Sequence, residues 1–205
     1  MQSKKGKTKL WSLRFNTATV VLIPAAVAIN YIGKLLAAGL KLPLWLDSIG
    51  TILGGILAGP VVGALCGAIN NIIYGFMDPI SFVYAITSIG IGLVAGILAY
   101  FGKFETISKA IVSSLLLAGI AVVISTPLNM IFWGGQTGNA IGDAVFAATQ
   151  AGGLPVWLSS LLDEIVVDLP DKVVTGLIVF GVYRSLPKKM KLLFNPAQKV
   201  ESLDE

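Results

Sequence analysis

Residues 50–67 read GTILGGILAGPVVGALCG, a stretch that contains no charged side chain and many small residues. The small residues recur at four-residue spacing in two series: Gly50, Gly54 and Ala58, and Gly55, Gly59, Gly63 and Gly67. Small residues at this spacing form a smooth strip along a helix, so that two helix backbones can approach closely within lipid. The stretch therefore predicts tightly packed membrane helices within the chain. The alternative is a smooth face that docks a partner membrane protein.

Apolar sequence extends outward from this stretch over residues 15–183. The chain of 205 residues is 55% hydrophobic and 13% charged, with a mean hydropathy of +0.83. A soluble domain typically has about 25% charged residues, whereas a helix that crosses the bilayer core needs about 20 mostly apolar residues. The composition therefore predicts one integral membrane domain, residues 1–205, without a sizeable soluble domain.

Turn signals divide residues 15–187 into six expected crossings. Helices are predicted over residues 15–38, 44–59, 60–76, 80–101 and 109–133. Residues 134–155 are predicted to be a long, polar, glycine-rich connection. The sixth helix begins either at Val156, with a kink at Pro170, or afresh at Pro170. The expected fold class is an all-α membrane protein, a bundle of six transmembrane helices, flanked by a basic N-terminus (1–14) and a tail (188–205).

Most of the fifteen Lys and Arg residues fall within residues 4–14, 103–109 and 184–199. Basic residues are retained on the cytoplasmic side of membranes, and six crossings place these segments on one side. We therefore expect a multi-pass protein of the cell membrane with cytoplasmic N- and C-termini. Lys34, near the far end of the first helix, is expected to extend to the headgroups.

The basic segments are expected to meet anionic lipid rather than nucleic acid. A basic segment before an apolar run is also typical of a signal peptide. The run over residues 15–36 is too long for that, which predicts a retained first helix.

The chain lacks the residues that several kinds of enzyme chemistry require. The chain contains no His and a single Cys, Cys66, which excludes Ser-His catalysis and histidine or cysteine-cluster metal sites. No G-x-x-x-x-G-K-[ST] loop for ATP occurs. We therefore expect no catalytic residues, no cofactor and no metal, and a protein that is not itself an enzyme.

Polar side chains in the apolar helices gather toward the predicted outer ends. Such residues are costly in a membrane and usually face a protein interior or a water-filled cavity. The residues predicted to bind a solute are Trp45, Asp47, Asn71, Tyr74, Asp78, Tyr84, Asn129, Trp133, Asp163 and Lys172. Individually, the aromatic residues also suit an interfacial belt and the asparagines suit helix–helix bonds. As a set they favour a pocket open to the outside, because the inner helix ends lack matching Asn and Asp.

Lys172 allows two interpretations. It follows Asp171 and lies one turn after Asp168, and opposite charges at such spacing pair on a helix. The alternative is contact with a charged group of the ligand. Pairing is preferred, because each buried partner then offsets part of the other's desolvation cost.

Four stretches carry a resemblance to a known family: LPLWLDSIGT at residues 42–51, GPVVGA at 59–64, the pair Asn70-Asn71, and DLPDK at 168–172. With the six expected helices, they resemble the substrate-binding S components of energy-coupling factor (ECF) vitamin transporters over residues 15–187. The resemblance implies a subunit that binds a vitamin from outside. It also implies docking on a transmembrane coupling subunit with two cytoplasmic ATPases, followed by toppling that releases the vitamin inside.

Many members of this family dock through an A-x-x-x-A motif in the first helix. Here that helix contains PAAVAINYIG, which offers Ala25 and Ala28 one turn apart but not the full motif. The predicted walls offer aromatic residues and amides more than positive charge, which favours a bulky, largely uncharged vitamin. The chain looks most like the cobalamin-type S components, with pantothenate, a pyrimidine precursor and queuosine as alternatives.

Two other classes of protein share some of these features. One is the membrane sensor domain of a signalling protein, although few residues follow Pro187 to form an output domain. The other is an enzyme that acts on lipid through the acids of residues 163–171 and a bound metal. Such phosphate chemistry normally adds nearby Arg or Lys, which are sparse at the predicted outer side.

Overall fold

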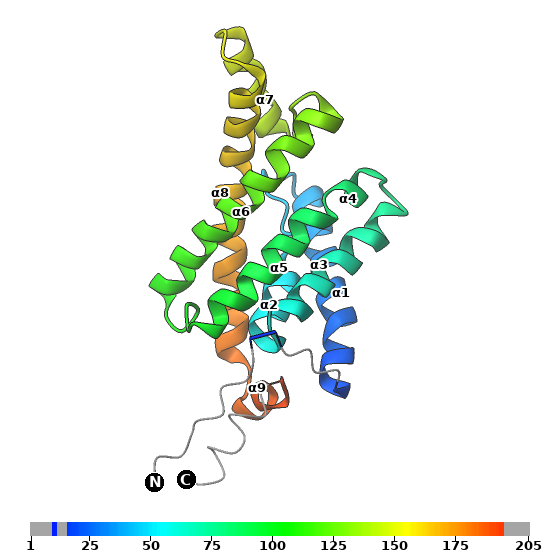
Figure 1. Ribbon diagram of the computed structural model, residues 1–205, viewed down its shortest axis with the longest axis vertical. Helices are drawn as coiled ribbons and strands as arrows, with labels where there is room; N and C mark the ends of the chain where they lie inside the picture. Colours follow the sequence, from blue (N-terminus) through cyan, green and yellow to red (C-terminus); the bar gives the residue numbers. More distant parts are fainter. Residues whose placement is uncertain (1–9, 12–15, 195–205) are drawn as a thin grey trace.

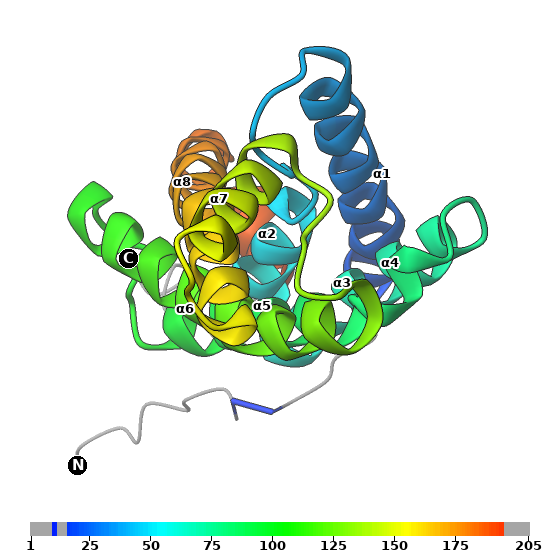
Figure 2. The same cartoon turned by 90° about the horizontal axis from the view of Figure 1, so that it is seen from above.

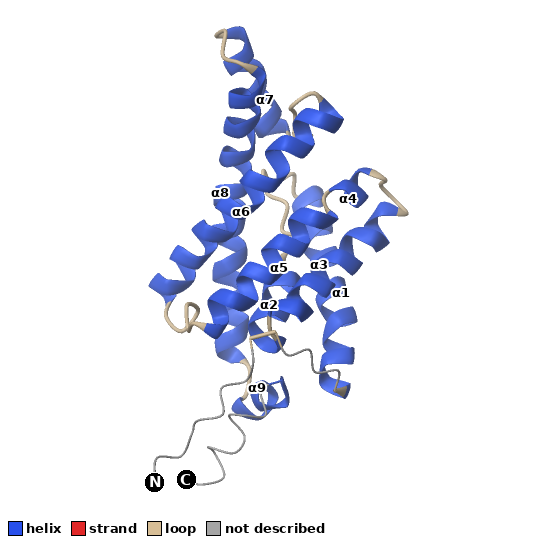
Figure 3. Ribbon diagram, in the orientation of Figure 1, coloured by secondary structure: helices blue, strands red, loops and turns tan. Residues whose placement is uncertain are grey.

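The computed structural model describes residues 10–11 and 16–194. Most of the predicted basic N-terminus (1–14) and the end of the predicted tail lie outside the described residues. The described part contains helices and connections but no strand (Figure 3). The longer helices are α1 (Thr17–Gly39), α2 (Ile49–Ala58), α3 (Pro60–Gly75), α5 (Ala85–Tyr100), α6 (Ile107–Trp133) and α8 (Val156–Ser185). The remaining helices are α4 (Ile80–Val83), α7 (Ala140–Ala151) and α9 (Lys188–Phe194). The all-helical prediction is confirmed.

Successive long helices alternate in direction along the long axis of the molecule (Figure 1). The helices α1, α3 and α6 run upward in this view, toward the side where α4 and the connection 40–48 lie and above which α7 projects. The helices α2, α5 and α8 run back toward the lower end, which carries α9. The connections predicted to face outside are therefore gathered at one end of the molecule.

Two helices, α1 and α6, are long and apolar enough by length and composition to cross a membrane. The helices α2, α3 and α5 are apolar but shorter. Many polar side chains are buried in the bundle, and many large apolar side chains are exposed on its surface. On α8, Asp163 and Lys172 are buried while Leu169 is 45% exposed, and on α1 Asn30 is fully buried while Val21 is 61% exposed. Polar groups inside and apolar groups outside are typical of a bundle surrounded by hydrocarbon.

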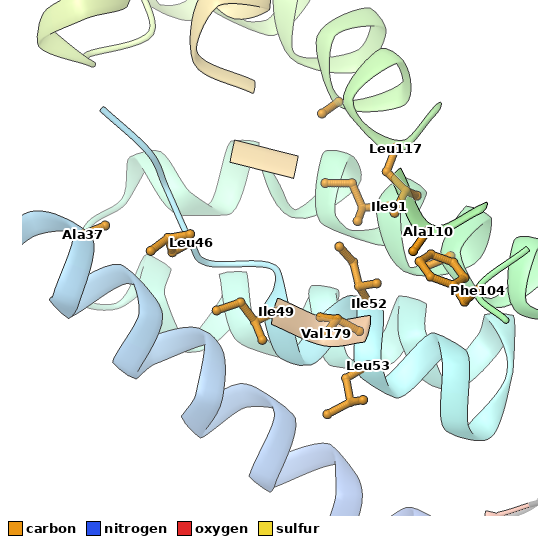
Figure 4. Packing of buried hydrophobic residues seen from close by; sticks show 12 residues of the cluster. Ala37, Leu46, Ile49, Ile52, Leu53, Ile91, Phe104, Ala110, Leu117 and Val179 are labelled. Carbon is orange, nitrogen blue, oxygen red and sulfur yellow. The ribbon is translucent and has the colours of Figure 1, made fainter. Parts of the chain in front are cut away.

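The apolar core lies around α2. Ile52 and Leu53 of α2 are clustered with Ile91 of α5, Leu117 of α6 and Val179 of α8 (Figure 4). The helix α2 contacts α1, α3, α5 and α8, and the helices α6, α7 and α8 form a second group. Seen from above, α1 and α6 lie on different sides of α2 (Figure 2). Contacts of α5 with α6 and of α2 with α8 join the two groups.

The small-residue series acts in packing within the chain. A Cβ atom on Gly92 of α5 would lie 2.2 Å from the carbonyl carbon of Gly63 in α3. A Cβ atom on Gly50 of α2 would lie 2.0 Å from the carbonyl oxygen of Ala26 in α1. Neither distance leaves room for a side chain, so the backbones touch at these crossings. These glycines therefore provide packing within the chain, which was the preferred interpretation of residues 50–67.

Three helix predictions need correction. The second helix begins at Ile49 rather than at residue 44, because the backbone of residues 45–46 bonds to α8 instead of continuing a helix. The predicted helix over 80–101 is interrupted at Tyr84. Residues 134–155 are not one irregular connection, since α7 forms within them and the Asn139 side chain caps its start.

The last helix resolves an open alternative. It begins at Val156 and continues through Pro170 to Ser185, as in the first of the two predicted arrangements.

The α3–α5 crossing makes a prediction about stability. We expect Gly92→Ala to lower the free energy of unfolding by about 1–3 kcal/mol, because the added methyl group must push the two backbones apart. The matched control is Gly119→Ala in α6, where a Cβ atom meets nothing within 4 Å. Alanine there is expected to preserve or raise stability, since its helix propensity exceeds that of glycine by about 1 kcal/mol. Thermal unfolding in detergent measures both, and equal melting temperatures for the two variants would contradict the close crossing.

Candidate functional site

A chain of hydrogen bonds links the start of α5 to α6 and α8. The Tyr84 hydroxyl donates to Oδ1 of Asn129. Nδ2 of Asn129 donates to Oε1 of Glu164 at 2.5 Å. Asn129 is fully buried and Glu164 nearly so. Because both ends of its amide are engaged, Asn129 is held in one orientation between the two helices.

Farther along α8, Lys172 lies between two acids. Its Nζ atom donates to Oδ1 of Asp168 at 3.2 Å and to Oδ2 of Asp171 at 2.5 Å. All three side chains are buried. The pairing preferred from the sequence spacing is present, and it offsets the desolvation cost of the buried ammonium group.

Asp171 also holds the connection between α1 and α2. Its Oδ1 atom accepts the backbone N–H groups of Trp45 at 3.0 Å and Leu46 at 2.8 Å. Leu46 has a φ of 50°, in the left-handed region that is unfavourable for a leucine. The carboxylate therefore stabilises a strained turn. Trp45 lies outside the helices, and its backbone is held in place by α8.

Asp163 plays a similar part for the segment after α6. Its carboxylate accepts the Thr137 backbone N–H at 3.2 Å and the Thr137 hydroxyl at 2.8 Å. It also packs against α7, because a Cβ atom on Gly142 would lie 1.9 Å from Oδ1 of Asp163. The buried acids of α8 thus hold two of the connections at the upper end of Figure 1.

A second polar group lies between α1 and α3. The rings of Tyr31 and Tyr74 have centroids 5.0 Å apart. Nζ of Lys34 lies 4.0 Å from the centroid of the Tyr74 ring. Lys34 therefore lies against an aromatic ring of the bundle and is partly exposed. That it extends to the headgroups stays a prediction.

Asp47 lies in the connection 40–48, near charged residues of both polar groups. It is within electrostatic range of Lys172, Asp171 and Lys34. Tyr74 is also within electrostatic range of Asp47. Asp47 is partly buried, in the connection that Asp171 holds.

The remaining predicted residues have other surroundings. Asn71 donates to the Ser88 hydroxyl at 2.6 Å and to the Gly67 carbonyl at 3.1 Å, so its amide serves the contact of α3 with α5. Asp78 lies in the turn between α3 and α4 and accepts the Ile80 N–H at 3.4 Å.

Trp133 lies beside Tyr84. Its buried indole N–H nevertheless makes no contact that has full hydrogen-bond geometry among the described residues. Ala25 and Ala28, the candidate docking residues, are exposed on α1.

Several residues of this site were absent from the predicted set. Asn30 is fully buried, and its Oδ1 atom accepts the Gly50 backbone N–H at 2.7 Å while Nδ2 donates to the Thr51 hydroxyl at 2.9 Å. Glu164 and Asp168 were also absent from that set, although Asp168 was expected to pair with Lys172. Ser160, Glu164, Asp168 and Lys172 recur at four-residue spacing, and this polar face of α8 is the signal that identifies them.

Comparisons of the chain with protein-family models, curated proteins and solved structures find no match. The described residues also contain no group of three or more His, Cys, Asp and Glu side chains arranged to hold a metal ion. The function is therefore argued from the arrangement of these side chains.

The Asp171 contact predicts how the α1–α2 connection responds to mutation. We expect Asp171→Asn to speed amide hydrogen exchange at Trp45 and Leu46 about fivefold, since a neutral acceptor bonds more weakly than a carboxylate by about 1 kcal/mol. Asp78→Asn is the control, because Asp78 bonds only within its own turn. Exchange is measured by mass spectrometry on the full chain in detergent. A wild-type rate in D171N would show that this carboxylate does not hold the connection.

Proposed function

We propose that the protein is a multi-pass protein of the cell membrane with six crossings and cytoplasmic termini. Two helices of spanning length, an apolar perimeter and alternating helix directions support this. The distribution of charge supports the orientation, since the α5–α6 connection, which contains Lys103, and the lysine-rich helix α9 lie toward the lower end of Figure 1. Basic residues favour the cytoplasmic side.

We further propose that it is the substrate-binding S component of an ECF-type ABC importer that takes up a vitamin. The observation that carries this proposal is a pair of buried polar clusters on α8, one reaching α5 and α6 and the other reaching the connection 40–48. Membrane proteins rarely bury so many polar groups unless they serve a ligand or ion. The resemblance of residues 42–51 and 168–172 to the family adds to this, because the two stretches meet through Asp171.

The importer would work through partner subunits. The vitamin binds from the outer side, and the exposed strip of α1 at Ala25 and Ala28 docks on the coupling subunit. Two cytoplasmic ATPase subunits hydrolyse ATP, so the chain itself is not an enzyme. Toppling of the S component in the bilayer then releases the vitamin inside.

Cobalamin is the vitamin that we propose first. Trp45, Tyr84 and Trp133 supply aromatic surface near these clusters, and α7 adds a helix above them that is long enough to contact a large solute. Pantothenate, a pyrimidine precursor and queuosine are the alternatives within the same class. A membrane sensor domain is the alternative of another class, and co-purification with a kinase instead of ATPases would favour it.

The topology is tested by labelling single cysteines in a Cys66→Ala background. We expect Lys41→Cys to react with a membrane-impermeant maleimide in intact cells, and Lys103→Cys to react only after permeabilisation. Both positions are exposed. Wild-type Cys66 is fully buried and is the negative control. Labelling of position 103 in intact cells would contradict cytoplasmic termini.

Binding is tested by calorimetry on the purified chain with cobalamin, pantothenate, a pyrimidine precursor and queuosine in turn. We expect one of them to bind, and Trp133→Ala to weaken that binding at least tenfold, about 1.4 kcal/mol. Trp157→Ala is the matched control, because Trp157 is 54% exposed at the start of α8. Equal losses in the two variants would place the solute elsewhere. Failure of the chain to co-purify with a coupling subunit and ATPases would count against the transporter.

A further inference from the structure

The acids of α8 are already provided with donors. Asp163 accepts from Thr137 and Glu164 from Asn129. Asp168 and Asp171 accept from Lys172. A positively charged solute would have to displace these internal partners, so the buried acids do not by themselves select a cation.

Several buried donors lack a hydrogen-bond partner among the described residues. They are the indole N–H of Trp133 and the hydroxyls of Ser48, Tyr74, Thr126, Ser160 and Thr175. The Trp133 indole lies beside the Tyr84 side chain. The Tyr74 hydroxyl differs from the others because a lysine side chain lies against its ring, and Tyr74 is only 8% exposed. Buried polar groups are nearly always paired, so the Tyr74 hydroxyl is a donor that a ligand atom can complete.

Lys34 adds positive charge over the face of the Tyr74 ring. Within the described part of the chain it forms neither a salt bridge nor a hydrogen bond, and its contact with the Tyr74 ring leaves its three N–H donors available. Lys172, by contrast, is engaged by two carboxylates. Asp47 lies within electrostatic range of Lys34 but does not form a salt bridge with it.

We propose that Lys34 and Tyr74 form a subsite for an anionic group, a carboxylate or a phosphate, on the bound solute. The ammonium group supplies the charge, the Tyr74 ring holds the ammonium group by a cation–π contact, and the Tyr74 hydroxyl donates to the anion. This subsite adds detail to the proposed function. It rests on that function, because it assumes that the protein binds a solute. It also modifies the expectation of a largely uncharged vitamin, since the anionic group is one part of the molecule.

Mutations of Asp47 and Lys34 are expected to change anion binding in opposite directions. The negative charge of Asp47 opposes an anion beside Lys34, so its removal strengthens anion binding while removal of the Lys34 charge abolishes it. A merely structural role for these residues would make both changes harmful or both neutral.

The first experiment uses inorganic phosphate and acetate as probes on the full chain in dodecyl maltoside, which carries no phosphate. At constant ionic strength, we expect either probe to raise the melting temperature of the wild type, of Lys34→Arg and of the control Lys41→Met. We expect no rise in Lys34→Met and a larger rise in Asp47→Asn. An equal rise in Lys34→Met and the wild type, or no rise in any protein, would overturn the subsite.

The second experiment uses a matched pair of solutes, pantothenate and pantothenol, which has a hydroxymethyl group in place of the carboxylate. We expect the anionic member to bind at least tenfold more tightly to the wild type, and Lys34→Met to lose this preference. Equal binding of the neutral member would overturn the subsite.

Two further outcomes separate the proposals. If no vitamin binds but phosphate acts through Lys34, the proposed transport function fails and the anion subsite stands. If added phosphatidylglycerol alone produces the Lys34-dependent rise and blocks phosphate, a lipid headgroup occupies the subsite and the assignment to the solute is overturned.

Discussion

The buried ion pair of Lys172 with Asp168 and Asp171 is the interaction on which the upper half of the bundle depends. An ammonium group inside an apolar bundle is stable only because two carboxylates surround it. Asp171 then uses its other oxygen to hold the backbone of Trp45 and Leu46. One charged cluster thus connects the α1–α2 group of helices to the α6–α8 group, and it keeps the strained turn at Leu46 in place.

The same constraint explains where the polar residues lie. Apolar side chains cover the perimeter, so polar groups are satisfied only by one another, and this draws Tyr84, Asn129 and Glu164 into a single chain of contacts. Close approach of backbones at Gly63 and Gly92 makes the apolar part compact enough to enclose them. The groups left without partners, above all the Tyr74 hydroxyl, then become informative because most of the others are satisfied.

Much of the architecture could be predicted from local patterns. Apolar runs and Gly-Pro signals predicted the helices, and the spacing of Asp168 and Lys172 predicted their pairing. The helix α7 was missed because glycines at both of its ends outweighed the apolar spacing between them. The second helix was predicted too early because residues 44–48 have an ordinary helical composition. Their non-helical turn depends on Asp171, more than a hundred residues away.

The sequence by itself determined that the chain is helical, that its polarity suits a bilayer and that its acids gather on the last long helix. These properties follow from composition and from short-range periodicity, which each segment carries alone. Only the tertiary structure decided that Asn71 joins two helices, that Glu164 belongs to a buried polar cluster and that Lys34 lies over Tyr74. Those roles depend on which helix faces which, and that is set by the packing of side chains from segments far apart in the chain.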